Sequence, residues 1–596
     1  MNVSMQACSK IVNRARLDSK RWIPTRALCS EGEPRGLERE QRKLRVAVTR
    51  MKELRGFNAP KRVVTPPSED SYVIAWFRAD LRLCDNPMLA EAIHTGKGRV
   101  LPVYCFDSRN FGLTDEAKLP KCAAPRAQFL RECVQDLRNS LQEYGSDLIV
   151  RHGRTEVILA RLAKQYQCSH IIGSKQVAWD ELRIESKLRS LVTQMEIPPK
   201  VSFCCGAETL YHLEDLPREF YHVPDDIPQF RRSVEAQHHR PGTRIRLPFL
   251  PPDEGALLPL PEDIDRGTVP SLDDLLQESI PDESQRRVEP DARAPYVFRG
   301  GETAALEHAQ SFFWETDGVS KYNYTRKGMT MRGTPLSSML SVWLAQGCIS
   351  ARSLYHVMQS YERERVANST QWLFRDLIRR DYYRLLALRL HHELRFQRDY
   401  VKTYFQDGPR VPGQLTWKRD REAFEKWCMG KTGFPLVDAC MRELYTTGFL
   451  SGRGRMSVAS FLTRDLLIDW RWGAEWFQSR LVDYDSHSNY GNWVDIAGVG
   501  MDQQRQEPYV NVVNQAKSYD ENGDYVKHWL PELSKIPVEH IHEPYKIPAY
   551  ERNAYKCLAD YPEPVIDSYG RGGFLTKLGK DRDIRPFAVV RRAEKE

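Results

Sequence analysis

Short apolar runs separated by amphipathic stretches characterise the chain from position 72 to about position 203. Four of these runs have a length suited to strands buried on both faces: YVIAWF (72–77), VLPVYCF (100–106), DLIVRHG (147–153) and HIIGSK (170–175). Between them lie helical patterns, the clearest over 126–145, where Gly145 provides a stop. Strands that alternate with helices predict a parallel, Rossmann-like sheet with right-handed crossovers. We therefore expect an α/β domain here.

The pattern changes twice in the second half of the chain. Residues 206–300 are rich in Pro, Asp and Glu and have little periodicity, as expected of a long connection that wraps the surface or has a function of its own. From Gly301 onward the apolar spacing is almost wholly helical, as in 351–366 and 374–392. Ten of the 13 tryptophans lie after residue 300. Tryptophans in an all-α domain can surround an aromatic cofactor, but they are also ordinary core residues, and composition leaves both readings open.

These shifts in pattern divide the chain into five predicted parts. They are a targeting or disordered extension with its linker (1–66), an α/β domain (72–205), a connector (206–300), an all-α domain (301–545) and a C-terminal tail (546–596). A chain of 596 residues has ample length for two large cores.

Composition and charge narrow the class of protein. No apolar stretch reaches about 18 residues, so no membrane span is expected. The 13 cysteines contain no CxxC pair, which favours a reduced protein without structural zinc. The net charge of +8 is concentrated in residues 1–64, which hold 16 Lys or Arg against 6 Asp or Glu. The remaining residues sum to −2, so any surface for nucleic acid must be a local basic patch.

The N-terminal 30 residues have six basic residues and one acid, with Ser, Ala and Arg throughout. This composition is typical of an organelle transit peptide, and a solvated tail is the alternative. The residues do not separate a mitochondrial from a chloroplast destination. If the segment is only a tail, the nucleus or cytoplasm is the alternative location.

Two segments of the all-α part carry candidate chemistry. Residues 471–500 mix tryptophans with the run Asp-x-Asp-x-x-x-Asn, a combination that suits a site for a large, flat, polar-edged aromatic molecule. Residues 334–347 place serines at the start of an apolar helix, where hydroxyls and free N–H groups can hold a phosphate. An ordinary serine cap is the commoner explanation of the second pattern.

Several motifs in the right order resemble the photolyase/cryptochrome superfamily, and within it the DASH branch of cryptochromes. They include WFRADLRLCDN (76–86), YHVPDDIPQFRRSVE (221–235), SNYGNW (488–493) and YDENGDYVKHWLPEL (519–533). The resemblance covers roughly residues 72–545. It implies an α/β domain followed by an all-α domain that binds FAD, often with a 5,10-methenyltetrahydrofolate antenna in the α/β domain. Members absorb blue light, and many repair cyclobutane pyrimidine dimers, mostly in single-stranded DNA, by flipping the lesion into a cavity above FAD.

The resemblance also assigns residues to the cofactors. Around FAD it places Tyr322, Ser337, Ser338, Met339, Leu340, Ser341, Arg380, Arg455, Asp483, Asp485 and Asn489. The serines are expected at the pyrophosphate, and Arg455, paired with Asp483, is expected to stabilise a reduced, anionic flavin. Asn489 is expected to face flavin N5, since an amide can both donate and accept there. Glu132 matches the acidic residue expected at the antenna, although a helix-surface glutamate is the default reading.

Three tryptophans match the electron-transfer chain of the family: Trp493, Trp470 and Trp417. Sequence alone would interpret each of them as a packing residue. On the lesion side, Asp376 matches the carboxylate that hydrogen-bonds the dimer. The other residues assigned to DNA or the lesion are Arg379, Arg453, Met456 and Asp495.

The departures from the family pattern cluster on the lesion side. Asp376 stands for Glu, Arg379 for the stacking Trp, Gly452 for Asn and Asp495 for Tyr or Trp. The predicted function is light-driven repair of pyrimidine dimers in single-stranded DNA by a monomeric flavoprotein. The alternative is a blue-light photoreceptor whose repair activity is weak or lost.

Overall fold

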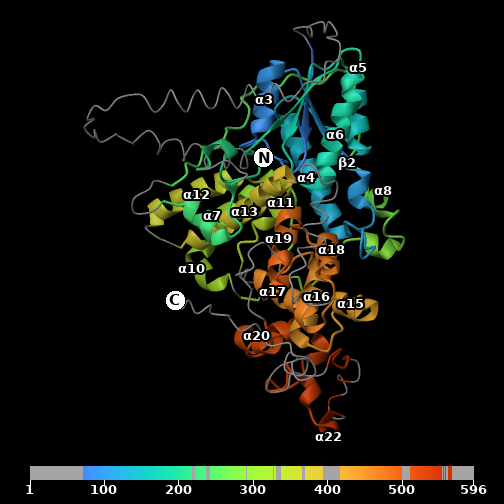
Figure 1. Cartoon of the computed structure of the whole chain (residues 1–596), viewed down its shortest axis with the longest axis vertical. Coiled ribbons are helices and arrows are strands. Elements are labelled where there is room, and N and C mark those ends of the chain that lie inside the picture. The colour runs from blue at the N-terminus through green and yellow to red at the C-terminus, as the bar shows by residue number, and fades with distance from the viewer. Residues whose placement is uncertain are drawn as a thin grey trace, which may run out of the picture.

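A five-stranded parallel sheet forms one end of the computed structural model (Figure 1). The structure describes residues 71–217, 222–236, 242–289, 291–294, 296–326, 328–329, 337–365, 369–393, 417–499, 510–552, 555, 558 and 561–566. The strands, in the order β3-β2-β1-β4-β5, are β1 (Val73–Phe77), β2 (Val100–Asp107), β3 (Ile149–Gly153), β4 (His170–Ser174) and β5 (Lys200–Cys204). The four predicted strands and the parallel α/β fold are confirmed. β5 was not among the predicted runs, because it is an edge strand with only half-buried residues and one exposed lysine.

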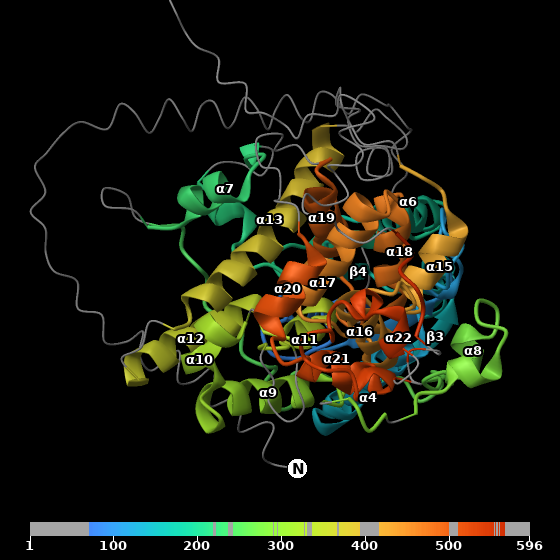
Figure 2. The ribbon, with the colours of Figure 1, turned by 90° about the horizontal axis from the view of Figure 1, so that it is seen from below.

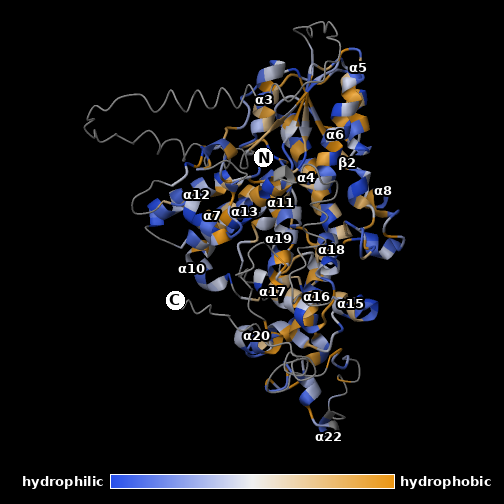
Figure 3. Cartoon of the chain, viewed as in Figure 1, coloured by the Kyte–Doolittle hydropathy of each residue, from blue (hydrophilic) through white to orange (hydrophobic). Residues whose placement is uncertain are grey.

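Strand β1 shows how its sequence places it between two layers of helices. Alternate side chains of a strand point to opposite faces. Val73, Ala75 and Phe77 pack in the core that contains α3 and α4, whereas Ile74 and Trp76 pack in a second core with α5 and α6. The apolar strands and the amphipathic helices around them are visible in Figure 3. The helical elements of this domain are α3 (Pro87–Gly96), η1 (Ser108–Phe111), α4 (Ala124–Glu143), α5 (Thr155–Gln165) and α6 (Trp179–Thr193).

The connector is ordered through much of its length by contacts with both domains. Its elements are η2 (Leu213–Asp215), α7 (Ile227–Val234), α8 (Leu272–Leu276) and η4 (Glu283–Arg286). Phe230 of α7 packs on Tyr382, with ring centroids 5.7 Å apart. At its far end, the carbonyl of Arg293 accepts a hydrogen bond from His528 at 2.6 Å. The long aperiodic stretch therefore wraps the molecule.

The second domain is helical, as predicted, and extends away from the sheet (Figures 1 and 2). Its first half contains α9 (Glu302–Gln310), η5 (Ser311–Glu315), α10 (Gly318–Thr325), α11 (Ser341–Gln346), α12 (Ala351–Arg365) and α13 (Gln371–Glu393). Its second half contains α15 (Arg421–Cys428), α16 (Pro435–Thr447), α17 (Gly452–Ser460), η6 (Phe461–Asp465), α18 (Trp470–Arg480), α19 (Ser486–Ala497), α20 (Val512–Tyr519), α21 (Asp524–Trp529), η7 (Pro531–Leu533), η8 (Pro544–Lys546) and α22 (Ala549–Arg552). Across the described ranges, we find no helix with both the length and the apolarity that a bilayer span requires. The predicted extension 1–66 and most of the tail lie outside the described residues.

A buried ion pair joins the two domains. Arg352 of α12 donates to both carboxylate oxygens of Asp85, which follows β1, at 2.7 and 3.0 Å. The side chains are 2% and 0% exposed, and Ser350 and the backbone N–H of Phe249 also donate to this carboxylate. A single apolar core runs from one face of the sheet into the helical domain behind this pair. The interface therefore fixes the helical domain against the sheet.

Asp85→Asn is expected to destabilise the protein by about 3–5 kcal/mol, because it leaves the Arg352 charge buried without its partner. Asparagine tolerates the left-handed backbone at this position, where φ is 52°. The loss of stability therefore reports the removal of the carboxylate charge and not a change in backbone strain. The measurement is the free energy of unfolding in urea. Glu422→Gln, which removes the exposed Glu422–Lys426 pair on α15, is the control and should cost less than about 1 kcal/mol.

Candidate functional site

A cavity of about 570 Å³ in the helical domain brings together residues from α10, α11, α13, α17, α18 and α19. Its volume lies in the usual range for small-molecule sites. Sixteen predicted site residues line it: Tyr322, Ser337, Ser338, Leu340, Ser341, Asp376, Arg379, Arg380, Arg453, Arg455, Met456, Asp483, Asp485, Asn489, Trp493 and Asp495. Met339, Trp470, Trp417 and Glu132 lie away from this lining.

An arginine–carboxylate couple forms one polar edge of the cavity. The side chain of Arg455 donates to both oxygens of Asp483 at 2.9 and 2.8 Å, and its Nε donates to the Leu450 carbonyl at 2.8 Å. Ser341, the first residue of α11, donates to the same carboxylate at 2.7 Å. Ser451 caps α17 and fixes the turn from which Arg455 projects. The side chain of Asp483 is only 3% exposed, whereas that of Arg455 is 26% exposed. The Arg455 guanidinium, held in place by Asp483, is therefore the group of the pair that can contact a ligand in the cavity.

A second pair of charges stands where the cavity adjoins the interdomain region. Asp485 caps α19 and accepts a 2.7 Å hydrogen bond from Nδ1 of His487, and Arg380 lies 3.9 Å away. Burial disfavours the carboxylate, but His487 and Arg380 outweigh burial and hold the pKa of Asp485 below its usual range. Arg380 also donates to the Leu344 carbonyl at 3.0 Å, which orients it. Asp485 is therefore ionised at neutral pH.

The serine segment reaches the cavity with its backbone turned sharply. Ser337, Ser338, Leu340 and Ser341 line the cavity, whereas the side chain of Met339 is buried in the core. The backbone of Met339 has φ of 52°, so this residue reverses the chain just before α11. Met339 therefore supplies the turn before α11, and its assignment to the cofactor stays a prediction.

Two polar side chains in the cavity, the Asn489 amide and the Tyr322 phenol, are hydrogen-bonded to neighbouring residues. Nδ2 of Asn489 donates to the Ala474 carbonyl at 3.0 Å, which orients the side chain and leaves its oxygen as an acceptor. The hydroxyl of Tyr322 donates to Asp376 at 3.0 Å, and Arg326 approaches the other oxygen of that carboxylate at 3.4 Å. Asp376 thus already holds two partners within the cavity wall.

The predicted DNA-side residues lie at the mouth and wall of the same cavity. Arg379 is exposed. Arg453 donates to Gln515 at 3.1 Å and lies over the ring of Tyr519. A Cβ added at Gly452 would meet no atom within 4 Å, so this position is open space. Asp495 accepts a 2.6 Å hydrogen bond from the hydroxyl of Tyr383, a cavity residue to which no sequence motif pointed.

The three predicted redox tryptophans are brought near one another by close backbone contacts. A Cβ at Gly473, three residues after Trp470 on α18, would lie 2.3 Å from Cη2 of Trp493, so the indole rests on that helix. Residue 418, next to Trp417, forms a parallel bridge with Ile468, and its carbonyl accepts from Asp469 N at 3.3 Å. Trp493 and Trp470 are buried, whereas Trp417 is half-buried. Of the three, only Trp493 lines the cavity and only Trp417 is not buried, and the electron path through them stays a prediction.

Trp427 belongs to the aromatic cluster behind Trp493. Its ring stacks with Phe424 and Phe477 and meets Trp493 edge-on, with centroids 6.4 Å apart. Its indole N–H donates to the Val458 carbonyl at 3.1 Å, so it acts as a packing residue.

A buried, protonated carboxyl stands behind Arg455. Glu443 of α16 is fully buried and receives hydrogen bonds from Tyr525 at 2.5 Å and Tyr296 at 3.2 Å. Burial raises the pKa of Glu443 to about 8, against the lowering effects of the two tyrosines and of Arg455. Glu443 therefore keeps its proton at neutral pH in the folded protein.

Glu443→Gln is expected to flatten the pH dependence of stability. In the folded state Glu443 binds a proton up to about pH 8, whereas the unfolded chain releases it near 4.5. The carboxyl's contribution is fully present below pH 4.5 and is lost as pH rises toward 8, at a slope of at most about 1.4 kcal/mol per pH unit. Thermal midpoints at pH 6 and pH 8 should therefore differ less in Glu443→Gln than in the parent. Glu539→Gln, at an exposed position, should keep the parent profile.

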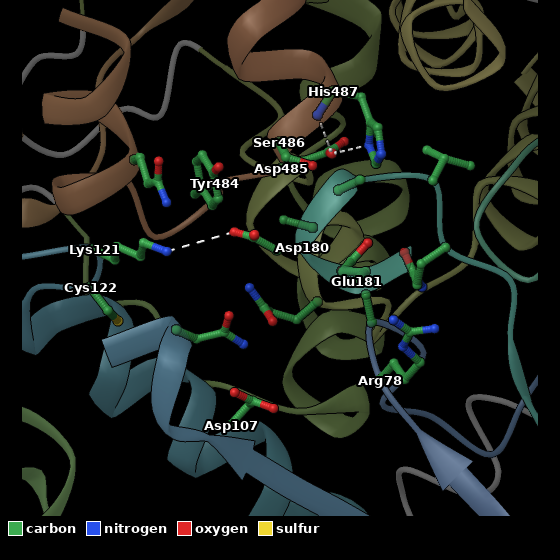
Figure 4. A pocket seen from close by; sticks show the side chains of 18 of the residues that line it. Arg78, Asp107, Lys121, Cys122, Asp180, Glu181, Tyr484, Asp485, Ser486 and His487 are labelled. Atoms are coloured by element: carbon green, nitrogen blue, oxygen red, sulfur yellow. Dashed lines mark hydrogen bonds and ion pairs between the residues drawn. The ribbon is translucent and has the colours of Figure 1, made fainter. Parts of the chain in front are cut away.

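A second cavity, of about 380 Å³, lies between the two domains (Figure 4). Lys121 faces Asp180 across it, and Asp485 and His487 enter from the helical domain. Two buried polar atoms at this cavity, His487 Nε2 and Glu181 Oε2, have no hydrogen-bond partner among the described residues. Glu132 lies elsewhere on α4, and its carboxylate accepts hydrogen bonds from Gly300 N at 2.8 Å and Gln128 at 2.7 Å.

Comparison with known families matches both domains of the chain. The model for the FAD binding domain of DNA photolyase matches residues 372–572, and the model for DNA photolyase matches residues 73–251. Cryptochrome DASH of Gloeobacter violaceus is 41% identical over 83% of this chain and 93% of its own length. The chloroplastic/mitochondrial cryptochrome DASH of Arabidopsis thaliana is 42% identical over 79% of this chain and 77% of its own length.

The fold comparison agrees with the sequence comparison. The crystal structure of the Synechocystis cryptochrome superposes with a TM-score of 0.74 at 36% identity, covering 88% of this chain and all of that one. A bacterial class III photolyase from Agrobacterium tumefaciens superposes with a TM-score of 0.64 at 25% identity, covering 86% of this chain and 96% of the other.

Proposed function

Because this chain belongs to the cryptochrome DASH family of FAD-containing, photolyase-like proteins, we propose that it repairs cyclobutane pyrimidine dimers in single-stranded DNA when illuminated with blue light. The observation that carries the proposal is the single cavity in which predicted flavin-side and lesion-side residues meet. FAD supplies light absorption and one-electron chemistry when bound. The protein supplies position, charge and exclusion of water.

The cavity residues fit FAD by their chemistry. Ser337 and Ser338 line the cavity beside the turn at Met339, where hydroxyls can hydrogen-bond a pyrophosphate, and Ser341 next to them donates to Asp483. The Arg455 guanidinium, held by Asp483, can stabilise negative charge on a reduced ring system. Asn489 and the Asp485 carboxylate provide polar groups for the edges of that ring and its ribityl chain.

The tryptophans define the proposed path for reducing equivalents. Trp493 lines the cavity and is proposed to give up the first electron after light absorption. Trp470 is then proposed to reduce the oxidised Trp493. Trp417, the half-buried member of the three, is proposed to exchange electrons with reductants in solution. Gly473 supports this role because only a residue without a side chain lets Trp493 pack against α18.

DNA is proposed to approach from the face that carries Arg379 and Arg453. Arg379 is exposed and Arg453 half-buried, and both line the cavity, so together they provide the local basic patch that nucleic-acid binding requires on a body of near-zero net charge. An arginine plane at position 379 can stack on a base, although less extensively than tryptophan. Asp376 is the proposed hydrogen-bond partner of the lesion, which would share this carboxylate with Tyr322 and Arg326. We propose that the protein acts as a monomer, which light scattering in solution would test.

A repair assay tests the proposal directly. The flavin of the purified protein is reduced, oligothymidine containing dimers is added, and recovery of thymine absorbance is followed under blue light. Recovery is expected, at a rate that rises in the combined variant Asp376→Glu, Arg379→Trp, Gly452→Asn and Asp495→Tyr. The open space at Gly452 accommodates the asparagine. Clean photoreduction without any recovery in the parent would contradict the repair function.

The engagement of Asp376 by Tyr322 and Arg326 favours a second candidate, a blue-light photoreceptor with weak or lost repair. The Asp495 carboxylate in the cavity wall also opposes an electron-rich lesion and phosphate. For this candidate, the parent protein photoreduces normally but leaves the dimers intact, and the combined variant gains repair.

The interdomain cavity is the proposed place for an antenna chromophore, with 5,10-methenyltetrahydrofolate as the class that the family implies. The unpartnered Nε2 of His487 and Oε2 of Glu181 can hydrogen-bond a polar heterocycle. Glu132 stays a prediction, since its carboxylate is already bound by Gly300 and Gln128. Reconstitution with the folate should produce energy transfer to FAD, and a His487→Leu variant should weaken it.

An organelle destination is proposed from the basic residues 1–30. Plant relatives carry chloroplastic/mitochondrial in their names. A fluorescent protein fused behind residues 1–66 should enter mitochondria or chloroplasts, and nuclear or cytoplasmic fluorescence would contradict the proposal.

A further inference from the structure

Tyr383, which is buried, and Asp495, which is half-buried, form a phenol–carboxylate pair in the wall of the proposed flavin cavity. The hydroxyl of Tyr383 on α13 donates to Oδ2 of Asp495 on α19 at 2.6 Å, and Oδ1 of Asn492 lies 3.4 Å from the same hydroxyl. Tyr383 is 3% exposed and both residues line the cavity. The hydrogen bond is short and charge-assisted, so the phenolic proton already points at the carboxylate oxygen that would accept it.

The tyrosine ring is held tightly against the helix that carries Trp493. A Cβ at Gly491 would lie 2.3 Å from the ring of Tyr383, so the ring occupies the space above that glycine. Gly491 is two residues from Trp493 and four residues from Asp495, which places Asp495 on the same face of α19 as the ring. The helices α13 and α19 also run side by side (Figure 2). Tyr383 therefore lines the same cavity as Trp493, the first tryptophan of the proposed chain, and has a base within hydrogen-bond distance.

Burial and the Asp495 charge raise the pKa of Tyr383 well above its usual value. The phenol therefore stays protonated at neutral pH, and removing an electron from it requires that the proton leave at the same time. A phenol radical cation is a very strong acid, so a carboxylate at 2.6 Å is a sufficient acceptor. Without such a base, a buried tyrosine is a poor electron donor.

From this geometry we infer that Tyr383 is a second electron donor of the cavity, with Asp495 as its proton acceptor. The inference rests on the proposed photoreduction through Trp493. After Trp493 has lost an electron, its indole radical cation takes one electron from Tyr383. The phenol O–H bond breaks, and an O–H bond forms at Oδ2 of Asp495. The products are a neutral indole, a neutral tyrosyl radical and a neutral carboxylic acid, so charge and protons balance.

The neighbouring Tyr382 provides a matched control on the same helix. Its side chain is also 3% exposed, and its ring centroid lies 5.6 Å from that of Tyr383. Its hydroxyl, however, donates to the backbone carbonyl of Asp225 at 2.6 Å, and it lies outside the cavity lining. A carbonyl is a far weaker base than a carboxylate, so oxidation of Tyr382 is not assisted.

The test follows radicals in the FAD-loaded protein after a blue flash, by transient absorption and electron paramagnetic resonance. A neutral tyrosyl radical should form as the indole radical decays, and its formation should slow in deuterated water. Tyr383→Phe should abolish the tyrosyl signal and lengthen the life of the indole radical, whereas Tyr382→Phe should change neither. Asp495→Asn keeps a hydrogen-bond partner but removes the base, so it should lose the radical without lowering the melting temperature.

Two outcomes separate this inference from the photoreduction on which it rests. If the indole radical forms and decays identically in the parent and Tyr383→Phe, the tyrosine is only a packing residue and the inference is overturned. If no indole radical forms, photoreduction through Trp493 is wrong, and the pair is tested by flash-quench oxidation with a photogenerated ruthenium(III) polypyridyl oxidant instead. In the flash-quench experiment, a tyrosyl radical that forms in the parent but in neither Tyr383→Phe nor Asp495→Asn supports the inference. A tyrosyl radical that still forms in Tyr383→Phe overturns it.

Discussion

Replacing Trp493 by phenylalanine is expected to slow blue-light photoreduction by at least about tenfold, which corresponds to a barrier about 1.4 kcal/mol higher, while the bound FAD stays yellow. The side chain lines the cavity and packs on Gly473 of α18, so it is the tryptophan of the chain placed to donate first. Phenylalanine preserves most of the packing but is far harder to oxidise than indole. The measurement is the rate of flavin bleaching under constant blue light with an external reductant.

Trp427→Phe is the control for this prediction. Trp427 meets Trp493 edge-on at 6.4 Å between centroids and is fully buried, so its replacement perturbs the same aromatic cluster. Photoreduction in Trp427→Phe should stay within about twofold of the parent, a change of less than about 0.5 kcal/mol in the barrier. A large loss in Trp427→Phe together with a normal rate in Trp493→Phe would mean that electrons travel through Trp427 instead.

The fold was predictable because its signals are local. A short apolar run such as VIAWF (73–77) predicts a strand buried on both faces without knowledge of its partners, and helical spacing marks the second domain. The strand β5 was missed because its half-buried edge position leaves no strong apolar pattern. Likewise, the ordered path of the connector depends on distant partners such as His528, which no local pattern reveals.

The candidate site was predictable where motifs carried it and unpredictable where tertiary contacts did. Motif matches placed Arg455, Asp483 and Ser341 at the flavin, and the structure joins them in one hydrogen-bonded group. No motif showed that Asp376 is held by Tyr322 and Arg326, because these partners come from separate segments. Tyr383 was missed for the same reason, since its chemistry depends on a carboxylate 112 positions away. The turn at Met339 was not predictable either, because a motif match does not report the backbone conformation of its residues.

We expect the Arg455–Asp483 couple to contribute strongly to FAD affinity. Arg455→Met is expected to weaken FAD binding by at least about 30-fold, which is about 2 kcal/mol, because truncating one partner of a buried charge pair costs about 2–5 kcal/mol. In this variant Asp483, with a side chain 3% exposed, keeps the Ser341 hydroxyl as its one side-chain donor among the described residues and presents an uncompensated negative charge to the cavity. The measurement is titration of the apoprotein with FAD, followed by quenching of flavin fluorescence.

Two further variants show whether the loss in Arg455→Met comes from the pair. Arg453→Met lies two residues away on the same helix, where its guanidinium contacts Gln515 and Tyr519 instead of a carboxylate, so FAD affinity should change less than about threefold. The double variant Arg455→Met with Asp483→Asn removes the uncompensated charge, so its affinity should exceed that of Arg455→Met alone. Equal FAD affinities in the parent and in Arg455→Met, with both proteins folded, would mean that the serine segment and Trp493 hold FAD without the charged couple.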